Sequence, residues 1–178
     1  MTTTHTPRPV PPRVLKELRA ADDAGRPMTP FTDAEGGAPL RCCLRRSEPG
    51  ETIALVSYAP LRRWAAETGA APGAYDEQGP VFIHAEDCPG PSGTATLPFT
   101  NAHRVLRRYA ADGRILGGRL VEPAENRDGA FTDTFADAFT DAFSDPEVAV
   151  VHVRAVEYGC FLYEVRRDRG RRAQGAAT

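Results

Sequence analysis

The sequence predicts an α+β fold in which a mainly antiparallel sheet, free to curl, carries one long amphipathic helix on a face. Three observations support this fold class. Segments with the composition of strands outnumber segments with the composition of helices. The strands follow one another as hairpins, without the strand–helix–strand alternation that a parallel sheet requires. A regular Phe-Thr-Asp repeat has the spacing of a helix with one apolar face.

The N-terminal part is expected to contain one helix between two irregular segments. Residues 1–12 are rich in Thr and Pro, and we expect them to be disordered. An apolar stripe that follows two prolines predicts a helix over 13–21. The frequent Gly and Pro residues of the segment 22–39 predict a loop.

The strands are recognised by alternation of apolar residues between turn signals. Pro49-Gly50 is a strong turn signal, and Asp112-Gly113 is typical of a hairpin turn. Strands are expected over 52–58, 81–85, 102–109, 114–121, 149–155 and 160–166.

The segment FTDTFADAFTDAFSD, residues 131–145, repeats every four residues. Each step of four advances the helix by one turn plus about 40°, so the Phe residues form a slowly drifting stripe. The Asp residues lie on the opposite, solvated face, and Pro146 ends the helix. The Phe stripe is expected to pack on the sheet, or else to serve a partner helix or a homodimer interface.

Length and charge limit the organisation and the partners of the chain. We expect a single globular domain over 13–167 and a flexible basic tail over 168–178. The net charge of -2 predicts no general attraction to nucleic acid or to a membrane. The N-terminus has no apolar signal core, and no apolar run approaches the ~20 residues that span a bilayer. We therefore expect a cytoplasmic protein with no nucleic-acid or membrane partner.

The strand around residue 152 carries the first candidate site. Alternation places Val150, His152 and Arg154 on one face. Arg154 is suited to hold an anionic ligand, and His152 is suited to act as an acid or a base. The alternative is a cross-strand ion pair with an acid such as Glu164.

The stretch GPVFIHAEDCP carries the second candidate site. His84 stands where an apolar strand becomes polar, and such strand ends often form pocket rims. His84 is a candidate general base, oriented by Glu86 or Asp87. The alternative is a core histidine with a backbone partner.

The four cysteines offer a third possibility. Cys160, which follows Tyr158-Gly159, is a candidate nucleophile near His152 or His84, or else a small core residue. Of the adjacent pair Cys42 and Cys43, one side chain is expected to be buried and the other to point outward.

The histidine and cysteine spacings do not predict a metal site. The chain has no C-x-x-C spacing. A set made of His84, Glu86, His103 and His152 would need three separate segments to meet. We therefore expect no metal and no other cofactor.

Three segments together resemble the bacterial family catalogued as domain of unknown function 1203. They are LRCCLRRSEPGETIALVSYAPL, GPVFIHAEDC and FSDPEVAVVHVRAVEYGCFLYEVRR, and the resemblance extends from Pro39 to Arg166. The family pattern has two cysteines three apart, where this chain has Leu40 and Cys43. That departure counts against a metal or disulfide role for Cys43. The resemblance implies a compact single domain and supplies no activity.

These observations predict a small enzyme that acts on a small organic, anionic substrate by cofactor-independent acid–base chemistry. The reaction would be an isomerisation, cyclisation, elimination or hydrolysis, and by analogy it would belong to a specialised biosynthetic pathway. The alternative is a non-catalytic module that binds a ligand, or binds a protein through the Phe-rich helix. In the enzyme, the catalytic residues would be His84, His152 and Cys160, and the substrate-binding residues would be Arg154, Glu86 and Tyr158.

Overall fold

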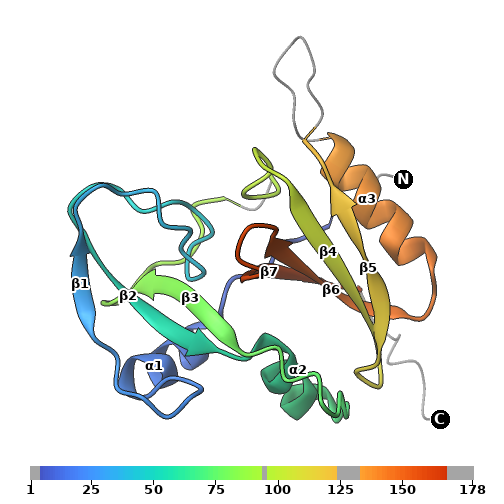
Figure 1. Cartoon of the computed structure of the whole chain (residues 1–178), viewed down its shortest axis with the longest axis horizontal. Helices are drawn as coiled ribbons and strands as arrows, with labels where there is room; N and C mark the ends of the chain where they lie inside the picture. Colours follow the sequence, from blue (N-terminus) through green and yellow to red (C-terminus); the bar gives the residue numbers. More distant parts are fainter. Residues whose placement is uncertain (1–4, 94–95, 124–132, 168–178) are drawn as a thin grey trace, which may run out of the picture.

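The computed structural model describes residues 5–93, 96–123 and 133–167, which form two antiparallel sheets and three helices (Figure 1). The predicted α+β class with antiparallel strands is confirmed. The strands divide between two sheets where a single sheet was expected. Sequence alternation identifies a strand but not its neighbour, because the neighbour is set by contacts distant in sequence.

The smaller sheet has the order β1-β2-β3 and packs on helix α1. It comprises β1 (Pro30–Asp33), β2 (Glu51–Tyr58) and β3 (Gly79–His84), and β1 lies in a segment that was expected to be a loop. Helix α1 (Pro12–Ala20) buries its apolar stripe in the same core. In the β2–β3 register, Ile53 lies opposite His84.

The larger sheet has the order β5-β4-β6-β7, with every neighbouring pair antiparallel. Its strands are β4 (Arg104–Ala110), β5 (Ile115–Val121), β6 (Val148–Ala155) and β7 (Phe161–Arg166). The hairpin predicted at Asp112-Gly113 joins β4 to β5. Helix α3 covers one face of this sheet, and α2 lies on the opposite side (Figure 1).

Helix α3 (Asp133–Ser144) is the described part of the segment that was expected to be a long helix. Phe135 and Phe139 are fully buried against the larger sheet, whereas Asp137 and Asp141 are exposed. Phe131 lies outside the described residues. Because the larger sheet of the same chain buries Phe135 and Phe139, these two rings do not need a partner helix or a second copy to cover them.

Helix α2 (Pro60–Thr68) was expected only as a helical turn and has nine residues. Its Leu61 and Trp64 pack against Tyr109 and Val150. These two residues lie on the same face of β4 and β6 as His152, so that face combines an apolar end with a polar end.

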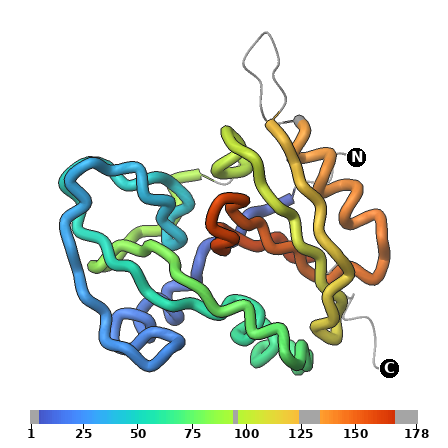
Figure 2. Tube along the Cα trace, viewed as in Figure 1, coloured from blue at the N-terminus to red at the C-terminus, as the bar shows by residue number. Residues whose placement is uncertain are grey.

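The N-terminal segment runs between the two sheets (Figure 2). Residues 1–12 were expected to be disordered, but residues 5–12 make defined contacts. The Arg8 N–H donates to the Glu164 carbonyl at 2.8 Å, the Val10 N–H donates to the Arg41 carbonyl at 2.9 Å, and the Val10 side chain is buried. The expected basic tail, 168–178, lies outside the described residues.

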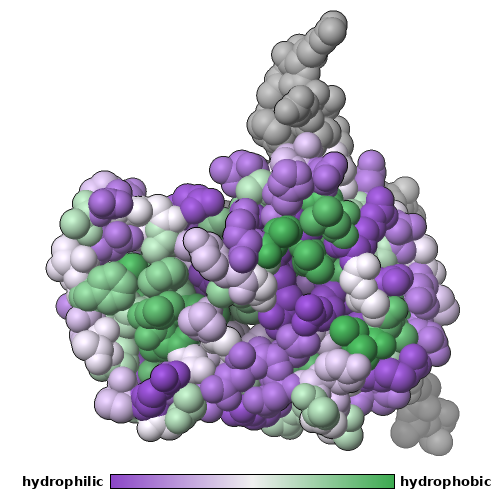
Figure 3. All heavy atoms as spheres, viewed as in Figure 1, coloured by the Kyte–Doolittle hydropathy of each residue, from purple (hydrophilic) through white to green (hydrophobic). Residues whose placement is uncertain are grey.

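The surface in Figure 3 alternates between apolar and polar regions. Hydrophobic side chains gather over the smaller sheet, where Phe31 and Leu55 are exposed. Polar side chains form a band between the two sheets. In the described parts of the chain, none of the helices has the length and apolar character needed to cross a membrane.

Candidate functional site

Four side chains with nucleophilic or metal-binding atoms meet at the end of β3. They are Cys42, Cys43, His84 and Cys88, and one such atom from each lies within 4.8 Å of all the others. The four residues come from a turn before β2, from the last residue of β3 and from the loop that follows it. This is the cysteine–histidine cluster.

The turn that carries the two adjacent cysteines is held against β3. Leu40 forms a parallel bridge with Phe82, and the Leu44 N–H donates to the Leu40 carbonyl at 3.0 Å. Leu44 has a φ of 58°, a left-handed conformation that is costly for a bulky residue and that is often found at functional sites. Both Cys42 and Cys43 are buried, which corrects the expectation that one would point outward.

His84 connects the thiols to a carboxylate. Its Nδ1 atom lies 3.3 Å from the Cys42 sulfur and 3.9 Å from the Cys43 sulfur. Its Nε2 atom lies 3.3 Å from Oε1 of Glu51. The carboxylate beside the imidazole is therefore Glu51, where the sequence suggested Glu86 or Asp87.

Glu51 is itself held in place by three hydrogen bonds. Arg45 donates to its two oxygens at 2.6 and 2.9 Å, and the backbone N–H of Glu48 donates at 2.8 Å. These contacts, the Arg45 bond first, lower the pKa of Glu51 to about 2. Glu51 is therefore a fixed negative charge directed at the imidazole.

The two residues that were expected to orient His84 are held elsewhere. Arg19 of α1 donates to the backbone carbonyl of Glu86 and, at 3.2 Å, to the carboxylate of Asp87. Arg19 also donates to the carbonyl of His84 at 3.3 Å. These bonds fasten the start of the Cys88 loop to α1.

The two adjacent thiols differ in acidity. A hydrogen bond from the Cys42 thiol lowers the pKa of Cys43 to about 6, although burial opposes that change. The same bond and burial raise the pKa of Cys42. Cys43 is therefore the member of the pair that ionises first.

A pocket of about 350 Å³ opens beside the cluster. Cys43, His84 and Cys88 are all part of its wall. Its charged lining residues are Arg45, Glu51, Glu86 and Asp87. Three carboxylates against one guanidinium make the mouth of the pocket acidic.

His152 is enclosed in the face of the larger sheet. It is fully buried, and its ring lies 4.9 Å from the ring of Tyr109 and 5.1 Å from that of Phe161. Its Nε2 atom is 3.6 Å from the Glu164 carboxylate, the cross-strand partner that the sequence offered as the alternative. Burial lowers the pKa of His152, so its neutral form is favoured.

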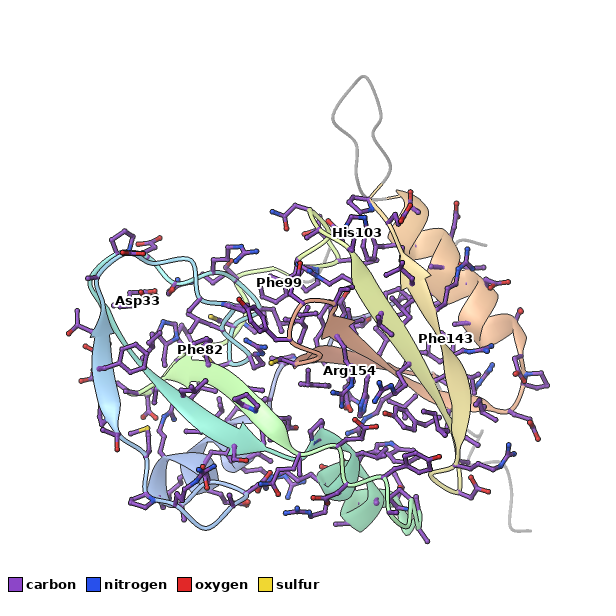
Figure 4. The ribbon with its side chains drawn as sticks, viewed as in Figure 1. Asp33, Phe82, Phe99, His103, Phe143 and Arg154 are labelled. Atoms are coloured by element: carbon purple, nitrogen blue, oxygen red, sulfur yellow. The ribbon has the colours of Figure 1, made fainter. Side chains whose placement is uncertain are left out.

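Arg154 lies between the two sheets (Figure 4). Its Nη2 atom is 2.6 Å from a carboxylate oxygen of Glu77, and its Nη1 donates to the Gly159 carbonyl at 2.8 Å. Cys160 contacts the carbonyl of Tyr158, whose side chain is exposed. The lining of the pocket at His84 includes Glu86 but none of Arg154, His152, Tyr158 and Cys160.

Sequence reasoning missed Glu51 and the meeting of the cysteines. A signal for Glu51 existed, because antiparallel pairing of the two predicted strands brings the start of β2 beside the end of β3. We expected no metal-binding set, and the combination considered was His84, Glu86, His103 and His152. The cluster shares only His84 with that combination.

Comparison with known proteins gives one match. The model of a family described as protein of unknown function (DUF1203) matches residues 37–167, a range that contains the whole cysteine–histidine cluster. This match confirms the resemblance found in the sequence. No curated protein and no solved structure matches the chain.

Proposed function

The chain belongs to the DUF1203 family, and from the geometry at His84 we propose that it is a small enzyme that hydrolyses a small carboxylic ester or amide, with Cys43 as nucleophile. The observation that carries the proposal is the series of contacts from Glu51 to His84 to Cys43 at the wall of a pocket. A nucleophile, a base and a group that orients the base are the components of covalent catalysis. Hydrolysis is one of the reaction classes that the sequence suggested.

The reaction proceeds in two halves. The Cys43 thiolate attacks the carbonyl carbon, the bond to the leaving group breaks, and protonated His84 gives a proton to the leaving group. His84 then takes a proton from water, and the resulting hydroxide attacks the thioester. The thioester bond breaks, the acid leaves, and the thiolate is restored. Glu51 orients the imidazole.

The charge of the pocket limits the substrate. Glu51, Glu86 and Asp87 oppose the single cation Arg45 in the lining, so an uncharged or cationic molecule is favoured over an anion. The anionic substrate suggested by the sequence depended on Arg154, which is paired with Glu77. The volume of about 350 Å³ suits a small molecule.

Site-resolved alkylation tests the nucleophile without a known substrate. Full-length reduced protein, treated with a chelator, is reacted with iodoacetamide, and mass spectrometry follows each cysteine. Cys43 is expected to react faster than Cys160 in the same sample, because the hydrogen bond from Cys42 and the nearby His84 stabilise its thiolate. His84→Asn should lower the alkylation rate of Cys43 by about tenfold or more, and Glu51→Gln should lower that rate less.

The control variant is Cys160→Ser, which should leave the rate at Cys43 unchanged. With 4-nitrophenyl acetate as the carbonyl probe, the acetyl group should appear on Cys43 and then turn over. The proposal fails if Cys43 reacts no faster than Cys160, or if His84→Asn has no effect on it. Circular dichroism verifies that each variant is folded.

A ligand-binding module without chemistry is the second candidate. It is favoured by a larger pocket of about 970 Å³ between α2 and the end of α3, with Trp64, Phe143 and Arg166 in its lining. Binding of a protein through the Phe-rich helix has less support, because Phe135 and Phe139 are buried. An inert Cys43 in the alkylation experiment would favour this second candidate.

A further inference from the structure

We propose that Cys42, Cys43, Cys88 and His84 form a binding site for a thiophilic divalent metal ion of the zinc class. The site does not depend on the proposed reaction, since it requires only that four ligand atoms converge. Three thiolates and one imidazole are the ligand types that zinc prefers in four-coordinate sites.

The distances among the ligand atoms of Cys42, Cys43 and His84 are close to those around a single tetrahedral ion, and Cys88 lies near the same centre. Zinc binds sulfur at about 2.3 Å and imidazole nitrogen at about 2.0–2.1 Å, so its ligands lie about 3.5–3.8 Å from one another. The two sulfurs of Cys42 and Cys43 are 3.9 Å apart, and Nδ1 of His84 lies 3.3 and 3.9 Å from them. The Cys88 sulfur is within 4.8 Å of these atoms.

The groups around the ligands also fit a metal site. A metal-bound histidine commonly directs its second ring nitrogen to a carboxylate, and Nε2 of His84 lies 3.3 Å from Glu51. The backbone N–H of His84 donates to the Cys42 sulfur at 3.3 Å, a bond that stabilises a thiolate. Arg45, 3.4 Å from the imidazole, offsets the excess negative charge of three thiolates on a divalent ion.

A bound metal ion would join two separate segments of the chain. Cys42 and Cys43 precede β2, whereas Cys88 lies in the loop after β3. An ion held by all four residues would tie that loop to the turn and would leave no position open for substrate. Because Cys43 and His84 are needed in both roles, metal binding and thiol catalysis would exclude each other.

Metal titration of the full-length chain tests the site. Protein that has been stripped with a chelator and kept reduced is titrated with Co²⁺ and then with Zn²⁺. One equivalent of Co²⁺ should produce the absorption of tetrahedral cobalt and a thiolate charge-transfer band, and Zn²⁺ should remove both. Cys88→Ser should weaken binding by about tenfold or more, whereas Cys160→Ser should not change it.

Cys88 separates this proposal from the proposed enzyme, because it belongs to the metal site and not to the Glu51–His84–Cys43 series. A loss of cobalt affinity in Cys88→Ser therefore reports on the metal site, whereas the effect of His84→Asn on Cys43 alkylation in stripped protein reports on the enzyme. A second readout needs no variant: bound Zn²⁺ should protect Cys42, Cys43 and Cys88 from alkylation but not Cys160. Substoichiometric binding, unchanged affinity in Cys88→Ser, or cobalt absorption without a thiolate band would overturn the metal site.

Discussion

His84 and His152 show how differently two histidines of similar sequence context are used. Each follows apolar residues of a strand, and each was a candidate acid or base. His84 is the last residue of β3, so it opens onto a pocket and meets Glu51. His152 is in the middle of β6, where neighbouring strands and aromatic rings enclose it. Position along the strand separates the two.

Burial of His152 should make folding sensitive to pH. Its pKa is lowered in the folded state, so between that value and the unfolded value of about 6.5 only the unfolded chain binds the proton. His152 therefore does not reduce the free energy of unfolding above about pH 6.5. Below that pH it lowers this free energy by up to about 1.4 kcal/mol per pH unit. In urea unfolding, the free energy of unfolding of His152→Gln should decrease less over this pH range than that of the unchanged protein.

His152 and its charged neighbours change protonation in different pH ranges. Glu164, Glu77 and Arg154 are the charged groups that act on it, and the pKa of Glu164 is lowered from 4.5, so the carboxylate titrates at lower pH. His103→Gln is the matched control, since the His103 side chain is more than half exposed. If the free energy of unfolding of His152→Gln falls with decreasing pH as steeply as that of the unchanged protein, His152 is not the group responsible.

At the scale of a single element, the turn of the β4–β5 hairpin is specified by its own residues and is also packed against the loop after α2. Its turn was predicted from Asp112-Gly113, and Gly113 has a φ of 94°. The tip also contacts the loop after α2, where the Ala71 N–H donates to the Asp112 carbonyl at 2.8 Å. A Cβ atom on Gly113 would lie 2.8 Å from the backbone nitrogen of Pro72.

Gly113→Ala should therefore destabilise the chain by more than backbone strain alone. Gly25→Ala is the matched control, because Gly25 has a φ of 77° with open space around it. The control should cost about 1–2 kcal/mol for the left-handed conformation, and Gly113→Ala should cost clearly more. Chemical denaturation measures both, and equal losses would show that the contact with Pro72 is unimportant.

Glu77 joins the two sheets at the scale of the whole molecule. It lies in the loop between α2 and β3, and its carboxylate meets Arg107 of β4 at 2.7 Å and Arg154 of β6 at 2.6 Å. The Glu77 and Arg154 side chains are both nearly buried. A buried carboxylate between two guanidinium groups is costly to remove, because the cations stay behind without compensation.

Glu77→Gln should lower the free energy of unfolding by about 3 kcal/mol, since two arginines lose their counter-charge. The neighbouring residue supplies the control: Asp76 pairs with Arg62 at the surface, and Asp76→Asn should cost less than about 1 kcal/mol. Guanidinium chloride unfolding compares the two variants. A loss for Glu77→Gln no larger than that for Asp76→Asn would show that this contact does not hold the sheets together.

Features with a local cause were predictable from the sequence. The presence of β2, β3 and β6, the Asp112-Gly113 turn and the burial of Phe135 and Phe139 follow from residue spacing, although β6 is buried on both faces. The strand β1 was missed because its four residues are mostly exposed at a sheet edge and carry no alternation. The burial of both Cys42 and Cys43 was missed because it depends on the packing of their turn against the smaller sheet, which two adjacent residues in a sequence do not reveal.

The sequence alone was sufficient for the fold class, the strand faces, the hairpin and the resemblance to the family, all of which depend on neighbours in the chain. The candidate site required the tertiary structure. Cys42 and His84 are 42 residues apart, and they meet only because the turn at Leu40 lies beside β3. The β2–β3 register brings Glu51 to the imidazole, whereas Arg154 lies on β6 of the other sheet, where it pairs with Glu77. The two predicted strands gave a signal for Glu51, but the contact of the cysteine turn with β3 has no local signal, so the complete cluster is seen only in the folded chain.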